Sequence, residues 1–356
     1  MDRIALFIDY IENLGGVERE IVALGKYFDM DVYAGIYNRK TTFPELEEYN
    51  IISFRDGRLQ HGLNQLYLRR KFSNLKLNGY DVYIMFGGAS LHIAKNHHPN
   101  IWYCNSPTRW LYDLYGIELQ KRSFMKRQLF RFPCFLYRYI DKKNVLHIDK
   151  ILANSINVQN RIKKFYNLES EVVYPPVDIK KFRFKKFGDF YLSATRLEPL
   201  RRIHLTVRAF QRMKSRKLVI SGDGIEYEKI KRMSSGFDNI KVLGRVSDEK
   251  QAELYGNCLA TIYIPYDEDF GLIPIESMSS GKPCIGANDG GVKETIIHKK
   301  TGLLIEPTVE NIIKAVEWLT PERAKKMRKA CEERAKKFSE DKFIRGIKKA
   351  IDEVAK

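Results

Sequence analysis

The chain has 356 residues, enough for two domains of ordinary size, and 44% hydrophobic with 12% aromatic residues excludes a disordered chain. Because its apolar stretches are too short to span a bilayer, we expect no transmembrane helix. The formal net charge of +18 predicts an anionic partner, which is nucleic acid, a membrane surface or a phosphorylated substrate.

The first apolar run, residues 4–8, is too short for a signal peptide and ends at the acidic Asp9. We interpret it as the first strand of a buried sheet. The five cysteines are few, odd in number and without C-x-x-C spacing, which predicts neither a disulfide framework nor a zinc site. A reducing, cytoplasmic location fits this pattern best.

Short apolar, β-branched runs alternate with longer helical patterns along the chain, which is typical of βαβ units and parallel sheets. The predicted strands are residues 4–8, 31–37, 81–85, 101–104 and 150–154 in the first half, then 190–194, 217–221, 240–243, 260–264 and 283–287. The last residues, from about Pro321, are rich in Lys, Glu and Ala and predict helix.

Pro175 and Pro176 stiffen the path between the two halves and predict a domain boundary there. We expect one domain over residues 1–178 and a second over residues 179–339. The predicted fold class is therefore α/β, with two Rossmann-like domains facing each other across a cleft. In such sheets, ligands bind at the carboxyl ends of the strands.

A glycine pair, Gly15 and Gly16, follows the first predicted strand and lets the backbone approach a ligand before a helix begins. The spacing departs from G-x-G-x-x-G, which argues against a dinucleotide fingerprint. A tight turn without a ligand remains an alternative.

Asn105 and Arg109 follow the strand predicted at residues 101–104 and place polar and cationic groups at the cleft edge of the first domain. A strand that ends at Pro107 and continues into an ordinary loop explains these residues equally well.

Residues 121–150 contain nine Lys or Arg residues against two acids, Asp141 and Asp149, with aromatic and aliphatic side chains between the charges. This composition suits an anionic lipid interface. The alternative is a solvated helix pair whose apolar side packs on the domain.

Arg196 and Arg201 follow the strand predicted at residues 190–194, where they are placed to meet diphosphate oxygens as charge-assisted donors. Basic loop residues are more often merely solvated. Their position in the same half as the carboxylates described next favours the functional interpretation. Gly222 marks a similar turn after the following strand.

The stretch after the strand predicted at residues 260–264 carries two carboxylates, Glu268 and Glu276, eight positions apart with Gly271 between them. A helix that opens near Pro274 would direct its free N–H groups at an anionic phosphate. The carboxylates would accept hydrogen bonds from sugar hydroxyls. A divalent-metal cluster at residues 267–269 is disfavoured, because no further acidic or His ligand accompanies it on an adjacent predicted loop.

Together these stretches resemble the family-4 (group 1) retaining glycosyltransferases of the GT-B fold. The resemblance covers nearly the whole chain and is strongest from residue 150 to residue 306. The ordered combination of motifs carries it, and its parts are residues 152–155, 173–178, 196–197, 222–224, 244–248, 268–276 and 301–304.

The resemblance implies that the second domain binds the nucleotide sugar and that the first domain faces the acceptor, with the final helix, about 340–356, packing back on the first. It implies that Glu276 binds the donor ribose and that Glu268 lies against the transferred sugar. Arg196 and Arg201 would stabilise the leaving diphosphate, since this fold generally works without a metal.

Further donor contacts implied by the resemblance involve mostly backbone. The segment Phe270, Gly271 and Leu272 would meet sugar and phosphate, and the loop of Gly15 and Gly16 would touch the phosphates. The turn at Gly222 belongs to the donor side, and Arg245 with Val246 would hold the base. Asn105 and Arg109 would lie on the acceptor side.

Two positions depart from the family pattern. The family usually has Lys then Gly where this chain has Arg201 and Arg202, which changes the shape of the cation and removes a flexible residue. Related enzymes often carry His where this chain has Asn105, and Asn can neither accept a proton nor become cationic.

The resemblance leads to a retaining transferase that makes an α-linked product without a cofactor or metal. Residues 104–113 resemble mannosyltransferases of surface-polysaccharide and lipid-linked glycan assembly, which favours GDP-mannose as donor and a lipid-linked or glycan acceptor. The basic segment 121–150 would hold the enzyme peripherally on the inner face of the cell membrane.

Three alternatives stay open at this point: a UDP-sugar-dependent transferase, a nucleotide-sugar epimerase of the same fold, and a nucleic-acid binder. Against nucleic acid, the sequence has no zinc, helix-turn-helix or RNA-binding signature, and the carboxylate pair would repel a phosphate backbone.

Overall fold

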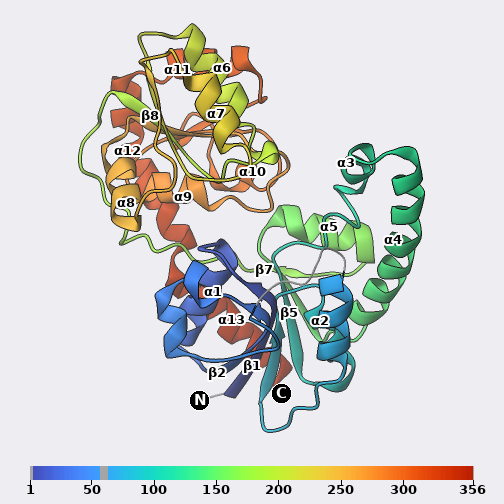
Figure 1. The fold of residues 1–356 in the computed structure, drawn as a ribbon. Helices are drawn as coiled ribbons and strands as arrows, with labels where there is room; N and C mark the ends of the chain where they lie inside the picture. Colours follow the sequence, from blue (N-terminus) through green and yellow to red (C-terminus); the bar gives the residue numbers. More distant parts are fainter. Residues whose placement is uncertain (1–2, 57–62, 356) are drawn as a thin grey trace. The chain divides into compact units, whose positions relative to one another are not determined.

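The computed structural model describes residues 3–56 and 63–355, and the chain divides into two compact units. One unit comprises Met1–Pro176 with Asp341–Lys356, and the other comprises Val177–Glu340. Each is built on a single sheet of parallel strands with helices packed against it (Figure 1). No helix in the described ranges is long and apolar enough to cross a membrane.

The N-terminal unit contains a seven-stranded sheet in the order β3-β2-β1-β4-β5-β6-β7, and every pairing is parallel. Its strands are β1 (Arg3–Ile11), β2 (Asp29–Tyr37), β3 (Asn50–Ser53), β4 (Val82–Met85), β5 (Asn100–Cys104), β6 (Lys150–Ala153) and β7 (Glu171–Val172). Its α-helices are α1 (Gly16–Gly25), α2 (Leu63–Ser73), α3 (Tyr115–Gln120), α4 (Phe124–Val145), α5 (Ile156–Tyr166) and α13 (Glu340–Val354), and its 3₁₀ turns include η3 (Ser90–Asn96).

Both faces of this sheet are buried, which explains why its strands are continuous apolar runs. Alternate residues of β1 point to opposite faces. Ile4 and Leu6 pack in a core that includes residues of α1 and α13, whereas Ala5 and Phe7 pack in a second core with residues of α2, η3 and α5. The last helix is thereby part of the N-terminal unit, and the ring of its Phe343 lies 5.6 Å from the ring of Tyr103.

The C-terminal unit contains a six-stranded parallel sheet in the order β10-β9-β8-β11-β12-β13. Its strands are β8 (Phe190–Ala194), β9 (Lys217–Ser221), β10 (Ile240–Val242), β11 (Ala260–Tyr263), β12 (Cys284–Ala287) and β13 (Gly302–Ile305). Its α-helices are α6 (Ile203–Arg212), α7 (Tyr227–Ser234), α8 (Asp248–Asn257), α9 (Leu272–Ser279), α10 (Val292–Thr295), α11 (Val309–Trp318) and α12 (Pro321–Ala335).

All ten predicted strands coincide with strands of the structure, and the prediction of an α/β protein with two parallel sheets is confirmed. Three strands were not predicted: β3, β7 and β13. All three lie at sheet edges, and β3 and β7 are only partly buried, whereas the apolar run of β13 gave a signal that was not used.

Candidate active site

The predicted donor-side residues lie in the loops and helix starts that follow β8, β9, β10 and β11 of the C-terminal unit. Because these strands are parallel, their carboxyl ends meet at one edge of the sheet. That edge therefore carries the sequence-predicted residues, which are Arg196, Arg201, Gly222, Arg245, Val246, Glu268, Phe270, Gly271, Leu272 and Glu276.

Arg201 lies at the centre of this edge. Its guanidinium forms an ion pair with Glu268, and its Nη1 donates a hydrogen bond to the hydroxyl of Tyr263 at 2.6 Å. The side chains of Arg201 and Glu268 are only 14% and 18% exposed. The Nε of Arg201 is buried without a hydrogen-bond partner among the described residues, so the guanidinium keeps one donor unused.

The charges in this cluster are fixed by their surroundings. Burial alone would lower the pKa of Arg201, but Tyr263 and Glu268 outweigh it and raise that pKa above its ordinary value. Burial, reinforced by the Glu268 carboxylate, raises the pKa of Tyr263 well above 10. The site thus combines a permanent guanidinium cation with a neutral phenol.

The loop that carries Glu268 is held by backbone contacts. The N–H of Gly291 donates to the Glu268 carbonyl at 2.7 Å, and the N–H of Asp267 donates to the Asp289 carboxylate at 3.0 Å. A Cβ on Gly290, whose φ is +54°, would lie 2.5 Å from Glu268 backbone atoms. Only glycine allows the two loops to approach this closely.

Helix α9 begins directly after this loop. Gly271 is its N-cap at φ +93°, and Leu272 is its first residue. A Cβ at Gly271 would lie 3.3 Å from the ring of Tyr263, so glycine is needed both for the dihedral and for the space. Phe270 is buried, with its ring 5.5 Å from that of Phe338, which anchors the segment.

Glu276 lies in α9 and is only 7% exposed. Its carboxylate accepts a hydrogen bond from the hydroxyl of Tyr255 at 2.7 Å. The phenol of Tyr255, which comes from α8, thereby fixes the orientation of the carboxylate.

The remaining arginines of this edge are arranged differently. Arg196 is 63% exposed and pairs with Glu198 at 2.9 Å, although its charge opposes the rise in the pKa of Tyr263 and so reaches the cluster electrostatically. Arg245 is exposed, whereas Val246 is half-buried against the core that contains Leu192. The structure thus brings Arg201 into direct contact with Glu268, and Arg196 only into their neighbourhood.

Arg202 occupies the position where the resemblance leads one to expect glycine. Its backbone is left-handed, with φ +54° and ψ +29°, so the conformation that glycine favours is kept by an arginine. The guanidinium lies 3.6 Å from the Asp289 carboxylate and 4.9 Å from the centre of the Tyr266 ring. These contacts offset part of the backbone strain.

The turn at Gly222 packs against the segment after β8. Gly222 has φ +129°, and a Cβ there would lie 2.0 Å from the Thr195 carbonyl. The N–H of Leu197 donates to the Asp223 carbonyl at 2.8 Å. This turn therefore supports the loop that carries the arginines.

In the N-terminal unit, Gly15 is the N-cap of α1 and Gly16 is its first residue. The carboxylate of Glu18 folds back to accept a hydrogen bond from the N–H of Asn13 at 3.1 Å. A Cβ at Gly15 would meet that carboxylate at 2.5 Å, so a larger residue there would require the Glu18 side chain to move.

Asn105 follows β5 and joins a buried network. Its Nδ2 donates to the carboxyl of Glu20 at 2.7 Å, and its own Oδ1 accepts from Asn154 at 3.0 Å. Burial raises the pKa of Glu20 to about 8, and the hydrogen bond from Asn105 opposes that shift. Arg109 forms an ion pair with Asp113 at 2.7 Å and is only 17% exposed.

Two tyrosines of the site were missed by sequence reasoning. Tyr263 is the last residue of β11 and Tyr255 lies in α8. In both places the sequence pattern predicts that a tyrosine is a residue of the hydrophobic core. The position of Tyr263 could have indicated a role in the site, because it is the last strand residue before the loop of Glu268. The acidic run at residues 267–269 forms no metal cluster, and the described ranges contain no group of three His, Cys, Asp or Glu side chains able to hold a metal ion.

Two α/β units, each with one parallel sheet and its candidate residues at the carboxyl edge, define the GT-B class of glycosyltransferase folds. The structure of sucrose-phosphate synthase from Thermosynechococcus elongatus matches with a TM-score of 0.79 at 16% identity, over 99% of both chains. The structure of Anabaena HepE in complex with UDP-glucose matches with a TM-score of 0.73 at 15% identity, over 99% of this chain and 100% of that one.

The model of the family described as glycosyl transferases group 1 matches residues 176–338, nearly all of the C-terminal unit. Among curated relatives, the alpha-1,3/1,6-mannosyltransferase ALG2 of Mus musculus is 27% identical over 260 residues, which is 63% of this chain. The match spans 60% of the length of that relative. The predicted GT-B fold is thereby confirmed, and the predicted resemblance to group 1 glycosyltransferases is confirmed over residues 176–338.

Proposed function

We propose that this chain is a retaining glycosyltransferase that moves mannose from GDP-mannose to a lipid-linked or glycan acceptor. The observation that carries the proposal is the Arg201 guanidinium, which is buried beside Glu268 and Tyr263 and retains an unpartnered Nε donor. Mannose is favoured because the mouse relative is named a mannosyltransferase.

Departure of the nucleoside diphosphate concentrates negative charge on its phosphate oxygens. A guanidinium that is already in place and poorly solvated stabilises that charge without reorganising. Arg201 meets this requirement, and the exposed Arg196 is proposed to bind the same oxygens. The N–H groups at the start of α9 add partial positive charge.

The carboxylates select the rest of the donor. In the proposal, Glu276 accepts hydrogen bonds from the ribose hydroxyls, and Glu268 accepts from the transferred sugar. Glu268, which pairs with Arg201, offers its carboxylate oxygens as hydrogen-bond acceptors. Arg245 and Val246 hold the base, and the backbone of Phe270, Gly271 and Leu272 meets sugar and phosphate.

The transfer step balances with no added cofactor. The bond between the sugar C1 and the diphosphate oxygen breaks, and the acceptor oxygen bonds to C1 on the same face. The acceptor hydroxyl gives its proton to the departing phosphate. Group 1 glycosyltransferases are generally metal-independent, and the proposal requires no metal.

A UDP-sugar is the second candidate donor, favoured by the UDP-glucose complex of the structural neighbour HepE. Mass spectrometry of reactions with GDP-mannose or UDP-glucose and a lipid-linked glycan distinguishes the two. We expect GDP release and a mannosylated product only when the acceptor is present. Conversion of the donor without an acceptor would favour an epimerase, and inertness toward every nucleotide sugar would overturn the proposal.

The acceptor class also predicts where the chain works. A lipid-linked acceptor lies in a membrane, so the basic segment 121–150 is proposed to hold the enzyme peripherally on the inner face of the cell membrane.

A further inference from the structure

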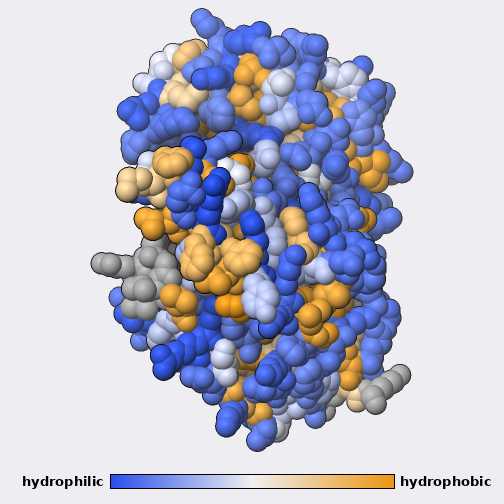
Figure 2. All heavy atoms as spheres, turned by 90° about the vertical axis from the view of Figure 1, so that its right-hand side faces the viewer, coloured by the Kyte–Doolittle hydropathy of each residue, from blue (hydrophilic) through white to orange (hydrophobic). Residues whose placement is uncertain are grey.

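Helix α4 directs apolar side chains outward from the N-terminal unit. Phe124, Met125, Leu129, Phe132 and Phe135 are 68–76% exposed, and Leu136, Tyr139 and Ile140 are also exposed. The face of the molecule that carries α4 shows orange, hydrophobic patches among blue, hydrophilic ones (Figure 2). The alternative in which the apolar side of this segment packs on its own domain is therefore wrong for these residues.

The charges of α4 are almost all positive. Its basic residues are Lys126, Arg127, Arg131, Arg138, Lys142 and Lys143, and its single acid, Asp141, is buried. Cationic side chains among exposed aromatic and aliphatic ones complement an anionic lipid surface in both charge and polarity.

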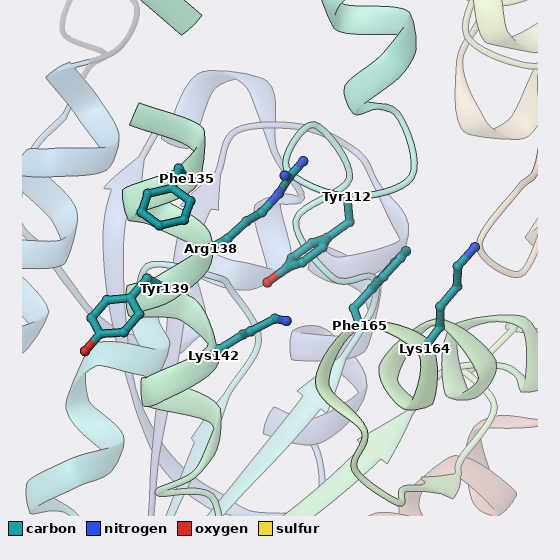
Figure 3. Close-up of a pocket in the computed structure, with 7 residues that line it drawn as sticks. All are labelled: Tyr112, Phe135, Arg138, Tyr139, Lys142, Lys164 and Phe165. Carbon is teal, nitrogen blue, oxygen red and sulfur yellow. The ribbon is translucent and has the colours of Figure 1, made fainter. Parts of the chain in front are cut away.

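A pocket of about 510 Å³ opens between α4, the end of α5 and the loop that precedes α3. Four aromatic rings and three cations line it: Tyr112, Phe135, Arg138, Tyr139, Lys142, Lys164 and Phe165 (Figure 3). The rings of Tyr112 and Phe165 stack at 4.7 Å and form one wall. Phe135 and Tyr139 belong both to this pocket and to the exposed apolar side of α4.

The cations of the pocket are available for an anion. Arg138 is held in place because its Nε donates to the Leu111 carbonyl at 2.6 Å and its guanidinium lies 4.2 Å from the centre of the Tyr115 ring. Both Nη groups remain as paired donors of the kind that binds phosphate. Lys142 and Lys164 are exposed, and neither forms an ion pair with any described residue.

Asp141, which directly precedes the lining residue Lys142, does not neutralise the pocket. Asp141 is buried and accepts hydrogen bonds from the hydroxyls of Tyr112 and Tyr166 at 2.8 and 2.7 Å. Burial raises the pKa of Asp141, while the two hydroxyls and the charge of Arg69 oppose that shift. Its carboxylate is therefore bound by hydroxyl groups and forms no ion pair with Lys142 or Lys164.

We propose that this pocket binds the phosphate headgroup of an anionic lipid whose chains lie against the outward apolar side chains of α4. The inference deepens the proposed function. It rests on that function for one point, which is that the bound lipid phosphate lies on the acceptor side. Cations that surround the headgroup, next to rings that reach into the acyl region, bind both parts of one molecule.

The test measures binding of the full chain to phosphatidylcholine vesicles with and without phosphatidic acid. The pocket variant is Arg138→Gln with Lys142→Gln. The matched control is Lys126→Gln with Arg131→Gln, which removes the same charge from exposed positions of α4 outside the pocket. Each lost cation weakens attraction to an anionic surface by about 1 kcal/mol, so both variants bind less tightly than the unmodified chain.

We expect the pocket variant to bind phosphatidic acid vesicles at least tenfold more weakly than the matched control, at a temperature at which both variants are folded. Equal weakening would mean diffuse attraction and would overturn the proposal. Glycerol phosphate provides the same phosphate without acyl chains. If it binds as tightly as the vesicles do, the pocket is a site for a soluble phosphate and the lipid assignment fails.

A third variant, Leu129→Ser with Phe132→Ser, removes apolar contacts outside the pocket and should also weaken vesicle binding. These measurements need no nucleotide sugar. Failure of the chain to bind any nucleotide sugar would therefore defeat the proposed function and leave the vesicle result intact. Binding of a nucleotide sugar, with equal vesicle binding by the pocket variant and the matched control, would defeat only the lipid pocket.

Discussion

Arg201 and Glu268 form a largely buried ion pair that joins the turn after β8 to the loop after β11. Breaking such a pair leaves the surviving charge uncompensated, which makes each partner dependent on the other. In a transferase the same guanidinium has a second use, because the departing diphosphate needs a cation that is already positioned.

Replacement of Arg201 by methionine should therefore lower kcat by about 100-fold to 1000-fold, as loss of one preorganised charge-stabilising donor does. Steady-state assays of nucleoside diphosphate release measure this. The matched control is Arg212→Met, which breaks an exposed ion pair with Glu310 at 2.9 Å. It should leave kcat unchanged, and equal effects of the two variants would remove Arg201 from the mechanism.

Glu276→Ala should weaken donor binding by about 10-fold to 100-fold, because hydrogen bonds to a charged group contribute about 1.5–3 kcal/mol each. Calorimetric titration with the donor gives the dissociation constant. Tyr255→Phe is the companion variant, since it keeps the carboxylate and removes only the phenol that orients it. Its effect should be smaller, and a larger effect than that of Glu276→Ala would argue against a direct contact between Glu276 and the donor.

Gly271→Ala should lower the free energy of unfolding by about 1–2 kcal/mol through its positive φ and should also reduce donor affinity. Its Cβ would press on the Tyr263 ring and shift the start of α9. Gly236→Ala separates the two effects, because Gly236 has φ +81° and open space around it. Donor affinity that falls equally in both variants would contradict a role for Gly271 in the site.

Glu20 should make the stability of the chain depend on pH. Burial raises its pKa from 4.5 to about 8, so between these values the folded state holds a proton that the unfolded state has lost. Stability from this group is present below pH 4.5 and is lost as pH rises toward 8. Glu20→Gln should flatten the fall in melting temperature over this range.

The control for this effect is Glu310→Gln, which changes an exposed carboxylate and should leave the slope as it is. If the melting temperature of the unmodified chain rises from pH 5 to pH 8, with the same slope in Glu20→Gln, the buried carboxyl does not carry the dependence.

Much of the fold follows from local pattern, and the failures have common causes. The buried runs at residues 4–8 and 190–194 identify central strands because both faces of those strands are covered. The edge strands β3 and β7 lack that signal, because their residues are exposed or only partly buried. Periodicity along α4 identifies an apolar side, but it does not tell whether that side meets protein or solvent.

The candidate site shows the same limit. Motif order placed Glu268 and Arg201 at one sheet edge, but their ion pair depends on the path of two loops that are separated by 67 positions. Arg202 has a left-handed backbone at the position where glycine was expected, and the conformational preference of arginine does not predict this. Tyr255 and Tyr263 contribute their hydroxyl groups to the site. They belong to a helix and a strand whose sequence pattern predicts only hydrophobic core residues.

The most direct test is a calorimetric titration of the unmodified chain and of Arg201→Met with GDP-mannose, with UDP-glucose as the second ligand. The account predicts saturable binding of GDP-mannose to the unmodified chain, weaker binding of UDP-glucose, and loss of affinity in Arg201→Met. Affinity for GDP-mannose that is unchanged in Arg201→Met, or an unmodified chain that binds neither nucleotide sugar, would contradict it.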